Sequence, residues 1–227
     1  MSSSAGTASG AVTPRERHRL QTREEILDAA LMVMAEQGVA ALNLTEVARR
    51  VGLRQPSLYQ YFDSRNAVFD ALFERGMRIH AELFTAAIDR HDAGWAAVRA
   101  ASWETVRFAA EQPELAELMF TRAVPGFTPS ERAYAPSLRV AELMQAAITA
   151  ATEHGELHAA AASESGVALL MVLVGGVGSQ HLANERDTEF TQSRLIPLLD
   201  TALDMYAAYF RPDRPADWTP EPSALPW

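Results

Sequence analysis

The sequence of 227 residues contains no cysteine. This excludes disulfide bonds, a thiol nucleophile and cysteine-ligated metal, and nothing argues for an oxidising compartment. Lysine is absent as well, so the whole Lys and Arg count of 20 consists of arginine. We attribute that bias to GC-rich coding rather than to function.

Long apolar runs are also missing. The longest, residues 167–178, falls well short of the ~20 residues that span a bilayer. The opening segment, MSSSAGTASG, lacks the charged start and apolar core of a signal peptide. We therefore expect a cytoplasmic protein with no membrane partner.

Motifs of common enzyme classes are not found. The sequence has no G-x-S-x-G elbow, no P-loop and no dinucleotide-binding fingerprint. The segment HGELH places His154 and His158 four residues apart around Glu156, but Gly155 should end a helix there and the spacing does not match HExxH. We therefore predict no enzyme activity, no catalytic residue, no bound metal and no cofactor.

The charges are divided unevenly along the chain, whose net charge is −9. Residues 1–66 contain eight Arg and seven Asp or Glu, whereas residues 67–227 contain twelve Arg and twenty-two Asp or Glu. The first part is therefore near neutral with local arginine clusters, and the rest is acidic. This asymmetry indicates two parts with different tasks.

Helical periodicity accounts for most of the chain, and no segment shows sustained strand alternation. Thr22 and Glu25 match a capping box for a first helix that Gly38 ends, while Thr45 caps a second helix before a turn at Gly52. Further helices are expected at about 56–62, 64–90, 94–112, 114–123, 129–154, 163–185 and 188–210. The pattern predicts an all-α fold.

The stretch LNLTEVARRVGLRQPSLYQYF, residues 42–62, predicts two helices joined by a glycine turn, which is a helix-turn-helix. Its second helix can lie in the major groove of DNA. Apolar residues at helical spacing should pack inward, and no carboxylate occurs between Glu46 and Asp63. The outer face suits a polyanion, although a three-helix piece of a structural bundle would share the pattern. That face holds Thr45, Arg49, Arg54, Gln55, Ser57, Tyr59, Gln60 and Tyr61.

Residues from about 21 to 81 resemble the DNA-binding domain of the TetR (tetracycline repressor) family. The segments that carry the resemblance are ILDAALMVMAEQGVAAL, LTEVARRVGL and PSLYQYFDSRNAVFDAL. The chain departs from the family's pattern at Arg54 and Pro56, where small polar and flexible residues are usual. The start of the third helix and the role of Arg54 therefore stay open.

The resemblance implies a set of DNA-contacting residues. Thr45 should touch a phosphate, and Arg65 should clamp the DNA backbone from the start of the fourth helix. Tyr59 and Tyr61 should reach phosphates or thymine methyl groups. The expected readers of bases or grooves are Gln55, Ser57 and Gln60, and the full set is Thr45, Arg54, Gln55, Pro56, Ser57, Tyr59, Gln60, Tyr61 and Arg65.

A short basic arm, residues 14–20, precedes the predicted first helix. Its arginines, Arg15, Arg17 and Arg19, could enter a neighbouring minor groove. Because Glu16 lies among them, a solvated tail without DNA contacts is the competing interpretation.

The acidic remainder should contain, by the same resemblance, a small-molecule pocket and a dimer interface. Its segment from Trp95 to Phe127 also resembles a C-terminal type of some actinobacterial members. The aromatic and methionine content suggests an apolar or aromatic effector. The pocket candidates are Phe84, Trp103, Arg107, Met119, Phe120, Phe127, Tyr134, Met144, Met171 and His181.

The last two helices are expected to pair with their copies in a four-helix dimer bundle. The segments SGVALLMVLVGGVGSQH and RLIPLLDTALDMYAAYF are apolar enough to need burial. Completion of a monomer core would explain the same pattern, so both interpretations stay open. The predicted interface residues are Gly175, Gly178, Leu195, Leu199, Leu203 and Tyr206.

We therefore predict a ligand-responsive transcriptional regulator, and more specifically a homodimeric repressor that a small effector releases from a palindromic DNA operator. Its expected regions are a disordered tail (1–13), a helix-turn-helix DNA-binding domain (14–66, with the motif at about 44–63), a ligand-binding and dimerisation domain (67–210) and a Pro-rich tail (211–227). The alternative is a ligand-binding or metal-dependent, enzyme-like helical protein without specific DNA binding.

Overall fold

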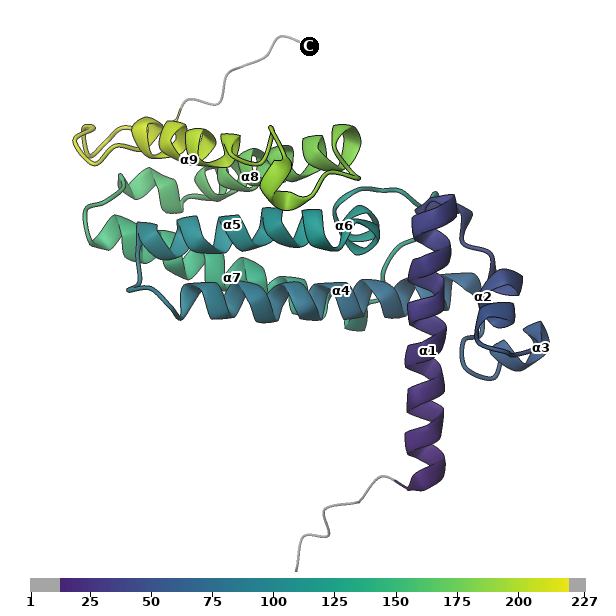
Figure 1. The fold of residues 1–227 in the computed structure, drawn as a ribbon. Helices are drawn as coiled ribbons and strands as arrows, with labels where there is room; N and C mark the ends of the chain where they lie inside the picture. Colours follow the sequence, from purple (N-terminus) through teal and green to yellow (C-terminus); the bar gives the residue numbers. More distant parts are fainter. Residues whose placement is uncertain (1–12, 221–227) are drawn as a thin grey trace, which may run out of the picture. The chain divides into compact units, whose positions relative to one another are not determined.

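The computed structural model describes residues 13–220, which form helices and loops without a strand (Figure 1). The predicted all-α fold is therefore confirmed. The α-helices are α1 (Pro14–Gln37), α2 (Leu44–Arg50), α3 (Gln55–Leu58), α4 (Arg65–Ile88), α5 (Trp95–Glu111), α6 (Pro113–Phe120), α7 (Glu131–Glu153), α8 (Glu164–Asn184) and α9 (Leu198–Tyr209). Short 3₁₀ helices are η1 (Val39–Ala41), η2 (Ala159–Ala162) and η3 (Phe190–Gln192).

Residue contacts divide the chain into two compact units, Met1–Val68 and Phe69–Trp227, here called the first and second units. The predicted boundary after residue 66 lies two residues earlier. Helix α4 begins in the first unit and continues into the second.

The first unit has a small core formed by one face of α1 and the inner faces of α2 and α3. Apolar residues three or four positions apart on α1 bury their side chains together, as expected for an amphipathic helix. Gly38 ends α1 with a φ of 90°, and Gly52 makes the turn between α2 and α3 with a φ of 70°. Fully buried members of this core include Ile26, Ala30, Val33, Met34, Val47 and Leu58.

Helix α1 starts earlier than the sequence predicts. Thr13 caps it: the Thr13 Oγ1 accepts from the Glu16 amide at 3.2 Å, and the Glu16 carboxylate accepts from the Thr13 amide at 2.8 Å. The sequence holds two capping-box matches, and Pro14 in the first turn favours this one over Thr22 and Glu25. The prediction that residues 14–20 form an arm preceding the first helix is therefore wrong, because these residues are the first turns of α1.

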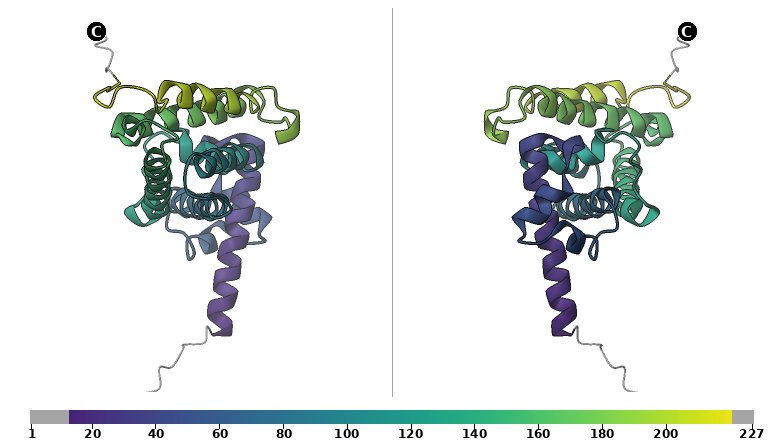
Figure 2. Two further views of the ribbon diagram at one scale, coloured as in Figure 1. Left: turned by 90° about the vertical axis from the view of Figure 1, so that its left-hand side faces the viewer. Right: turned by 90° about the vertical axis from the view of Figure 1, so that its right-hand side faces the viewer.

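The second unit packs α8 between α5 and α9, and α5 also packs on α7. Figures 1 and 2 show α8 and α9 side by side along one side of this unit. A single apolar core joins these helices with the second half of α4. Its fully buried residues include Phe84, Val98, Ile148, Leu170, Leu199 and Leu203.

The segment before α9 differs from its prediction. A helix was expected from residue 188, but only the 3₁₀ turn η3 and an irregular stretch of bends and turns precede Leu198. The Glu185 carboxylate fixes this stretch, since it accepts from the Ser193 hydroxyl at 2.6 Å and the Arg194 amide at 3.0 Å. These hydrogen bonds, that of Ser193 above all, hold the pKa of Glu185 below its usual value.

The described part of the predicted Pro-rich tail, residues 211–220, packs on the second unit. Trp218 packs its ring against His158 at 5.4 Å and Phe210 at 5.8 Å, and the Arg214 guanidinium lies 4.0 Å from the Trp218 ring centroid. Residues 211–220 of the predicted Pro-rich tail therefore contain turns without a helix, and they are packed on the second unit through Trp218. The rest of that prediction, 221–227, and nearly all of the predicted N-terminal tail lie outside the described residues.

Helix α8 is long and apolar enough to cross a membrane by length and composition alone, with 28% of its apolar window buried. The sequence prediction overlooked this because it counted only uninterrupted apolar residues. A core helix passes the same test, so the feature assigns no membrane. It does show that α8 exposes apolar surface.

Candidate DNA-binding face and ligand cavity

The start of α2 is joined to the start of α3 through side chains. Asn43 caps α2, since its Oδ1 accepts from the Thr45 amide at 3.0 Å. The prediction that Thr45 is the cap is therefore wrong. The Thr45 hydroxyl instead donates to Gln55 Oε1 at 3.0 Å, which brings two of the predicted DNA-contacting residues together.

Helix α3 is a single turn, Gln55–Leu58, followed by hydrogen-bonded turns through Phe62. Arg54 occupies its N-cap without a side-chain cap bond, and Pro56 stands in its first turn. Leu58 is the only residue of α3 that is fully buried. Leu58 is therefore the α3 side chain that packs the helix on the core of the first unit.

The predicted DNA-contacting residues lie mostly on the surface of the first unit. Ser57 and Tyr61 are half-buried, and Tyr59 is 44% exposed. The remaining exposed members are Thr45, Arg54, Gln55, Pro56, Gln60 and Arg65. Exposure fits a role in DNA contact, which stays a prediction.

Two arginines of α2 are occupied by carboxylates. Glu46 bonds Arg49 at 2.7 Å and Arg50 at 2.9 Å, and Arg50 also bonds Glu36 at 2.5 Å. The hydrogen bonds from Arg49 and then Arg50 lower the pKa of Glu46 to about 2. The positive charges of Arg49 and Arg50 are therefore offset by the neighbouring carboxylates of Glu46 and Glu36.

Arginines of α1 bind the segment that follows α3, residues 60–62. The Arg23 guanidinium lies 4.1 Å from the centroid of the Phe62 ring and donates to the Tyr61 carbonyl at 2.8 Å. Arg19 donates to the Gln60 carbonyl at 3.4 Å. The extended α1 thus fixes the backbone that carries two predicted reading residues, a role that the sequence analysis missed.

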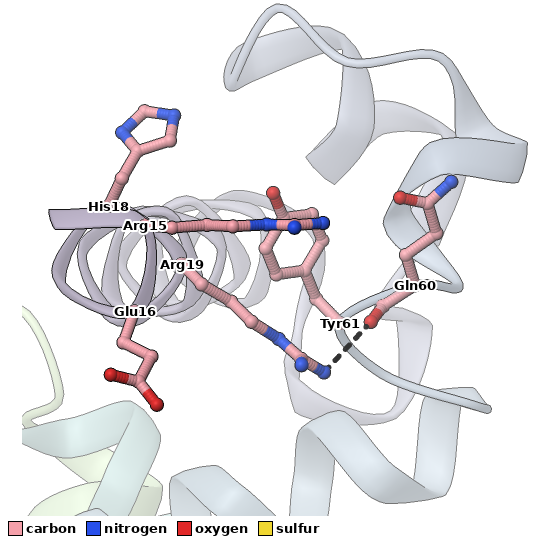
Figure 3. Close-up of a pocket in the computed structure, with 6 residues that line it drawn as sticks. All are labelled: Arg15, Glu16, His18, Arg19, Gln60 and Tyr61. Carbon is pink, nitrogen blue, oxygen red and sulfur yellow. Dashed lines mark hydrogen bonds between the residues drawn. The ribbon is translucent and has the colours of Figure 1, made fainter. Parts of the chain in front are cut away.

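A shallow hollow of about 410 Å³ lies between the first turns of α1 and the turn after α3 (Figure 3). Arg15 and Arg19 extend from α1 toward Tyr61 and Gln60, whereas Glu16 and His18 leave the helix on other sides (Figure 3). This basic edge stands beside the predicted DNA face. Whether Arg15, Arg17 and Arg19 contact DNA stays open.

The second unit contains a larger cavity of about 460 Å³ bounded by α4 to α8. Most of its lining is apolar, and several lining residues are exposed, so it opens to the surface. Six predicted pocket residues line it: Phe84, Met119, Phe120, Tyr134, Met144 and Met171.

The other four predicted pocket residues lie elsewhere. Trp103 donates from Nε1 to Asp200 at 3.1 Å, and Arg107 pairs with Glu111 one helical turn away. Phe127 packs on the Phe69 ring at 5.6 Å. His181 is fully buried beside Glu185 rather than in the lining. Residue type suggested a pocket at these positions, but Trp103, Arg107 and His181 lie on other helix faces and Phe127 lies in the loop before α7.

Sequence reasoning missed the most polar buried group of the lining, His80 on α4. Its exposed fraction is 4%, and its Nε2 lies 3.0 Å from the Thr105 Oγ1. His80 stands four residues before Phe84, on the same helical face, and this spacing was the available signal.

The residues predicted for a dimer interface lie mainly inside the chain. Gly175 is exposed and Leu195 is half-buried. The other four are buried in the second unit itself, which favours the monomer-core interpretation for them: Gly178, Leu199, Leu203 and Tyr206.

Similarity to known proteins supplies independent evidence. Residues 26–72 match the family described as bacterial regulatory proteins, tetR family. The tetracycline repressor protein class A from transposon 1721 of Escherichia coli is 37% identical over 70 residues, which are 31% of this chain and 31% of that protein. The curated relatives are matched over about half of their own length, 52%, or less.

Solved structures share the fold over most of the chain. The TetR family transcriptional regulator PfmR from Thermus thermophilus aligns with a TM-score of 0.64 and 18% identity, covering 81% of this chain and 97% of that one. The transcriptional regulator FadR from Bacillus subtilis, solved with stearoyl-CoA, aligns with a TM-score of 0.62 and 16% identity, covering 82% and 97%. The named relatives are repressors and regulators rather than enzymes.

Proposed function

The chain carries the N-terminal DNA-binding domain of the TetR family, and on this premise we propose that it is a ligand-responsive transcriptional repressor. It binds a palindromic operator as a homodimer, acts in the cytoplasm where the chromosome lies, and releases DNA when a small apolar or aromatic molecule fills the cavity of the second unit.

The outer face of the helix-turn-helix is the observation that carries this proposal. Gln55 and Gln60 offer amide groups suited to base edges, and Arg54 adds a cation at the N-cap of α3. No carboxylate stands between Glu46 and Asp63, and Glu46 is already held by two arginines. The face thus presents hydrogen-bonding groups to a polyanion with little local repulsion.

Homodimerisation is supported by an exposed apolar stripe on the last two helices. Val172 on α8 is 68% exposed, and Leu198 and Met205 on α9 are 53% and 64% exposed. A side chain added at Gly176 would meet nothing within 4 Å in the chain, which leaves room for a close helix. We propose this stripe, defined by Val172, Gly176, Leu198, Met205 and Tyr209, as the interface in place of the buried faces predicted from sequence.

A charge in the stripe tests the dimer. Met205→Asp should convert the protein to a monomer in sedimentation equilibrium, because a carboxylate would be buried without a partner. Leu138→Asp on α7 is the matched control, since Leu138 is equally apolar and 56% exposed but lies outside the stripe. A dimer that survives Met205→Asp unchanged argues against this interface.

Helix α4 is the proposed link between the cavity and DNA. Its first residues belong to the first unit, while His80 and Phe84 near its other end line the cavity. An effector that prefers one position of α4 shifts DNA affinity by its differential binding, typically ~1–3 kcal/mol.

Fluorescence anisotropy with DNA tests the function directly. Purified full-length protein should bind duplexes from its own upstream region more tightly than scrambled duplexes, with affinity falling steeply as salt rises. A random-sequence selection extends the search when the operator lies elsewhere. Equal, weak binding to every selected and scrambled duplex would contradict the proposal.

A further inference from the structure

His80 is a polar group in an otherwise apolar part of the cavity wall. Its ring packs against Phe108 at 5.4 Å, Phe120 at 5.6 Å and Phe84 at 5.8 Å. Its Nδ1 is closed off by the surrounding side chains and has no hydrogen-bond partner among the described residues, so a donor from the cavity reaches it only when one of the neighbouring rings moves. A buried nitrogen without a partner is unusual in a native structure and points to a missing one.

The hydrogen bonds around His80 determine which kind of partner is missing. The Thr105 hydroxyl donates its only hydrogen to the Ala101 carbonyl at 3.1 Å. The same oxygen must therefore accept from the His80 Nε2–H, which lies 3.0 Å away. Nδ1 is then left with a lone pair and no hydrogen, and it can only accept.

The protonation state agrees with this assignment. Burial lowers the pKa of His80 to about 4, so the imidazole is neutral at pH 7 and carries a single N–H. The imidazole donates that hydrogen to Thr105, so the lone pair of Nδ1 needs a donor that His80 itself does not supply.

The remaining lining limits the charge of the occupant. No Arg, Lys, Asp or Glu belongs to the described lining of the cavity. Its polar side chains besides His80 are hydroxyls: Thr105, Tyr134, Ser137 and Ser179. An ionised ligand group placed next to His80, away from the exposed edge of the cavity, would be desolvated without a counter-charge, which is strongly unfavourable.

From this geometry we propose that His80 is the specificity-determining residue of the cavity, and that the effector is a neutral, largely apolar alcohol or phenol whose hydroxyl donates to His80 Nδ1. The proposal rests on the ligand-responsive function proposed above and names the chemical class of the ligand. Carboxylates and phosphate-bearing ligands are disfavoured by the same wall.

A matched pair of probes isolates the hydroxyl. 2-Naphthol and 2-methoxynaphthalene share an aromatic body small enough for about 460 Å³, but only the naphthol donates a hydrogen bond. Calorimetric titration of the full chain without DNA should give 2-naphthol about tenfold higher affinity than the ether. 2-Naphthoate, which is ionised at pH 7, should bind more weakly than both.

Substitutions then assign the preference to His80. His80→Phe should bind the two probes equally, while His91→Phe, an exposed histidine outside the lining, should keep the tenfold preference. Ala141→Trp on the exposed edge of the lining should weaken both probes by filling the cavity, and it provides a second test should His80→Phe fold poorly.

Three outcomes would overturn the inference: no binding of either probe to the wild-type protein, equal binding of naphthol and ether, or tighter binding of naphthoate. If the protein binds DNA specifically but shows one of these outcomes, the proposed ligand class is wrong and the proposed regulator function still stands. If the protein prefers the naphthol but does not bind DNA specifically, the ligand class stands and the regulator function is wrong.

Discussion

Glu46 in the first unit shares its carboxylate between Arg49 and Arg50 at the surface, whereas His80 in the second unit lies neutral among aromatic rings and bonds only Thr105. The first arrangement pairs charges at a partly exposed surface and offsets a carboxylate beside the predicted DNA face. The second keeps charge out altogether. On the proposed function, the two units would select opposite ligands, a polyanion and a neutral molecule, although both are built from helices.

The largest expected effect comes from the small core that supports the first unit. Leu58→Ala should cost ~2–5 kcal/mol of unfolding free energy, because a fully buried leucine leaves a cavity under a one-turn helix. Specific DNA binding, measured by anisotropy, should be lost, while 2-naphthol binding to the second unit stays. Loss of both activities would show that the two units do not behave separately.

Lowering the pH should destabilise the second unit at a higher pH than the first unit. The pKa of His80 is lowered by burial from 6.5 to about 4, so the unfolded chain binds a proton more readily. The stability that this histidine contributes is fully present above pH 6.5 and is lost as the pH falls to about 4, a change of about 3 kcal/mol.

Urea unfolding at several pH values measures that change. His80→Phe should remove most of the pH dependence between 6.5 and 4, since phenylalanine cannot take up a proton. His91→Phe is the control and should leave the slope unchanged. A slope that survives His80→Phe would assign the acid sensitivity to another group.

Smaller changes in DNA affinity should distinguish a base-contacting residue from a phosphate-contacting residue in the first unit. Gln60→Ala should cost ~1–3 kcal/mol on the preferred operator and relax sequence preference at one position. Arg65→Ala should weaken binding to all sequences alike and lower the salt slope by about 1.

Anisotropy on operator and scrambled duplexes across a salt series distinguishes these two patterns. Unchanged binding in both variants would contradict the predicted roles of Gln60 and Arg65. An Arg65→Ala variant that loses only operator binding would instead make Arg65 a base reader.

The smallest expected effect concerns the exposed ion pairs of the first unit. The pKa of Glu46 is lowered from 4.5 to about 2 by Arg49 and Arg50, so its stabilising contribution is present above pH 4.5 and disappears as the pH falls to about 2. Glu46→Gln should flatten the stability profile in this window alone, as followed by urea unfolding. Added salt should mimic the substitution, because the pairs are at the surface.

The sequence identified the helix-turn-helix well because its signals are local. The turn at Gly52 and the inward position of Leu58 depend on φ angle and helical spacing, which neighbouring residues determine. The start of α1 was missed since two equivalent capping boxes compete, and the one at Thr13, followed by Pro14 in the first turn, is the one that caps the helix. The helix expected from residue 188 fails because Glu185 holds the chain through Ser193 and Arg194.

The cavity was harder to predict because it depends on how helices are rotated against one another. Met119 and Met144 line it as expected, whereas Trp103 turns toward Asp200 on α9. For the last helices, the sequence did not distinguish the inner from the outer face: Leu203, predicted at the dimer interface, lies inside the second unit, whereas Met205 lies outside. Apolar periodicity shows that a face is covered without showing which molecule covers it.

The single turn of α3 has a consequence for how this protein could acquire new targets. Leu58 ties that turn to the core, and the Thr45 hydroxyl bonds its first residue, Gln55. Arg19 and Arg23 hold the following segment through its backbone carbonyls. Apart from the bond to Gln55, these anchors do not depend on the identity of the side chains facing outward. On the proposed function, operator preference could therefore be redirected in a library randomised at positions 54, 57 and 60, with little penalty to folding.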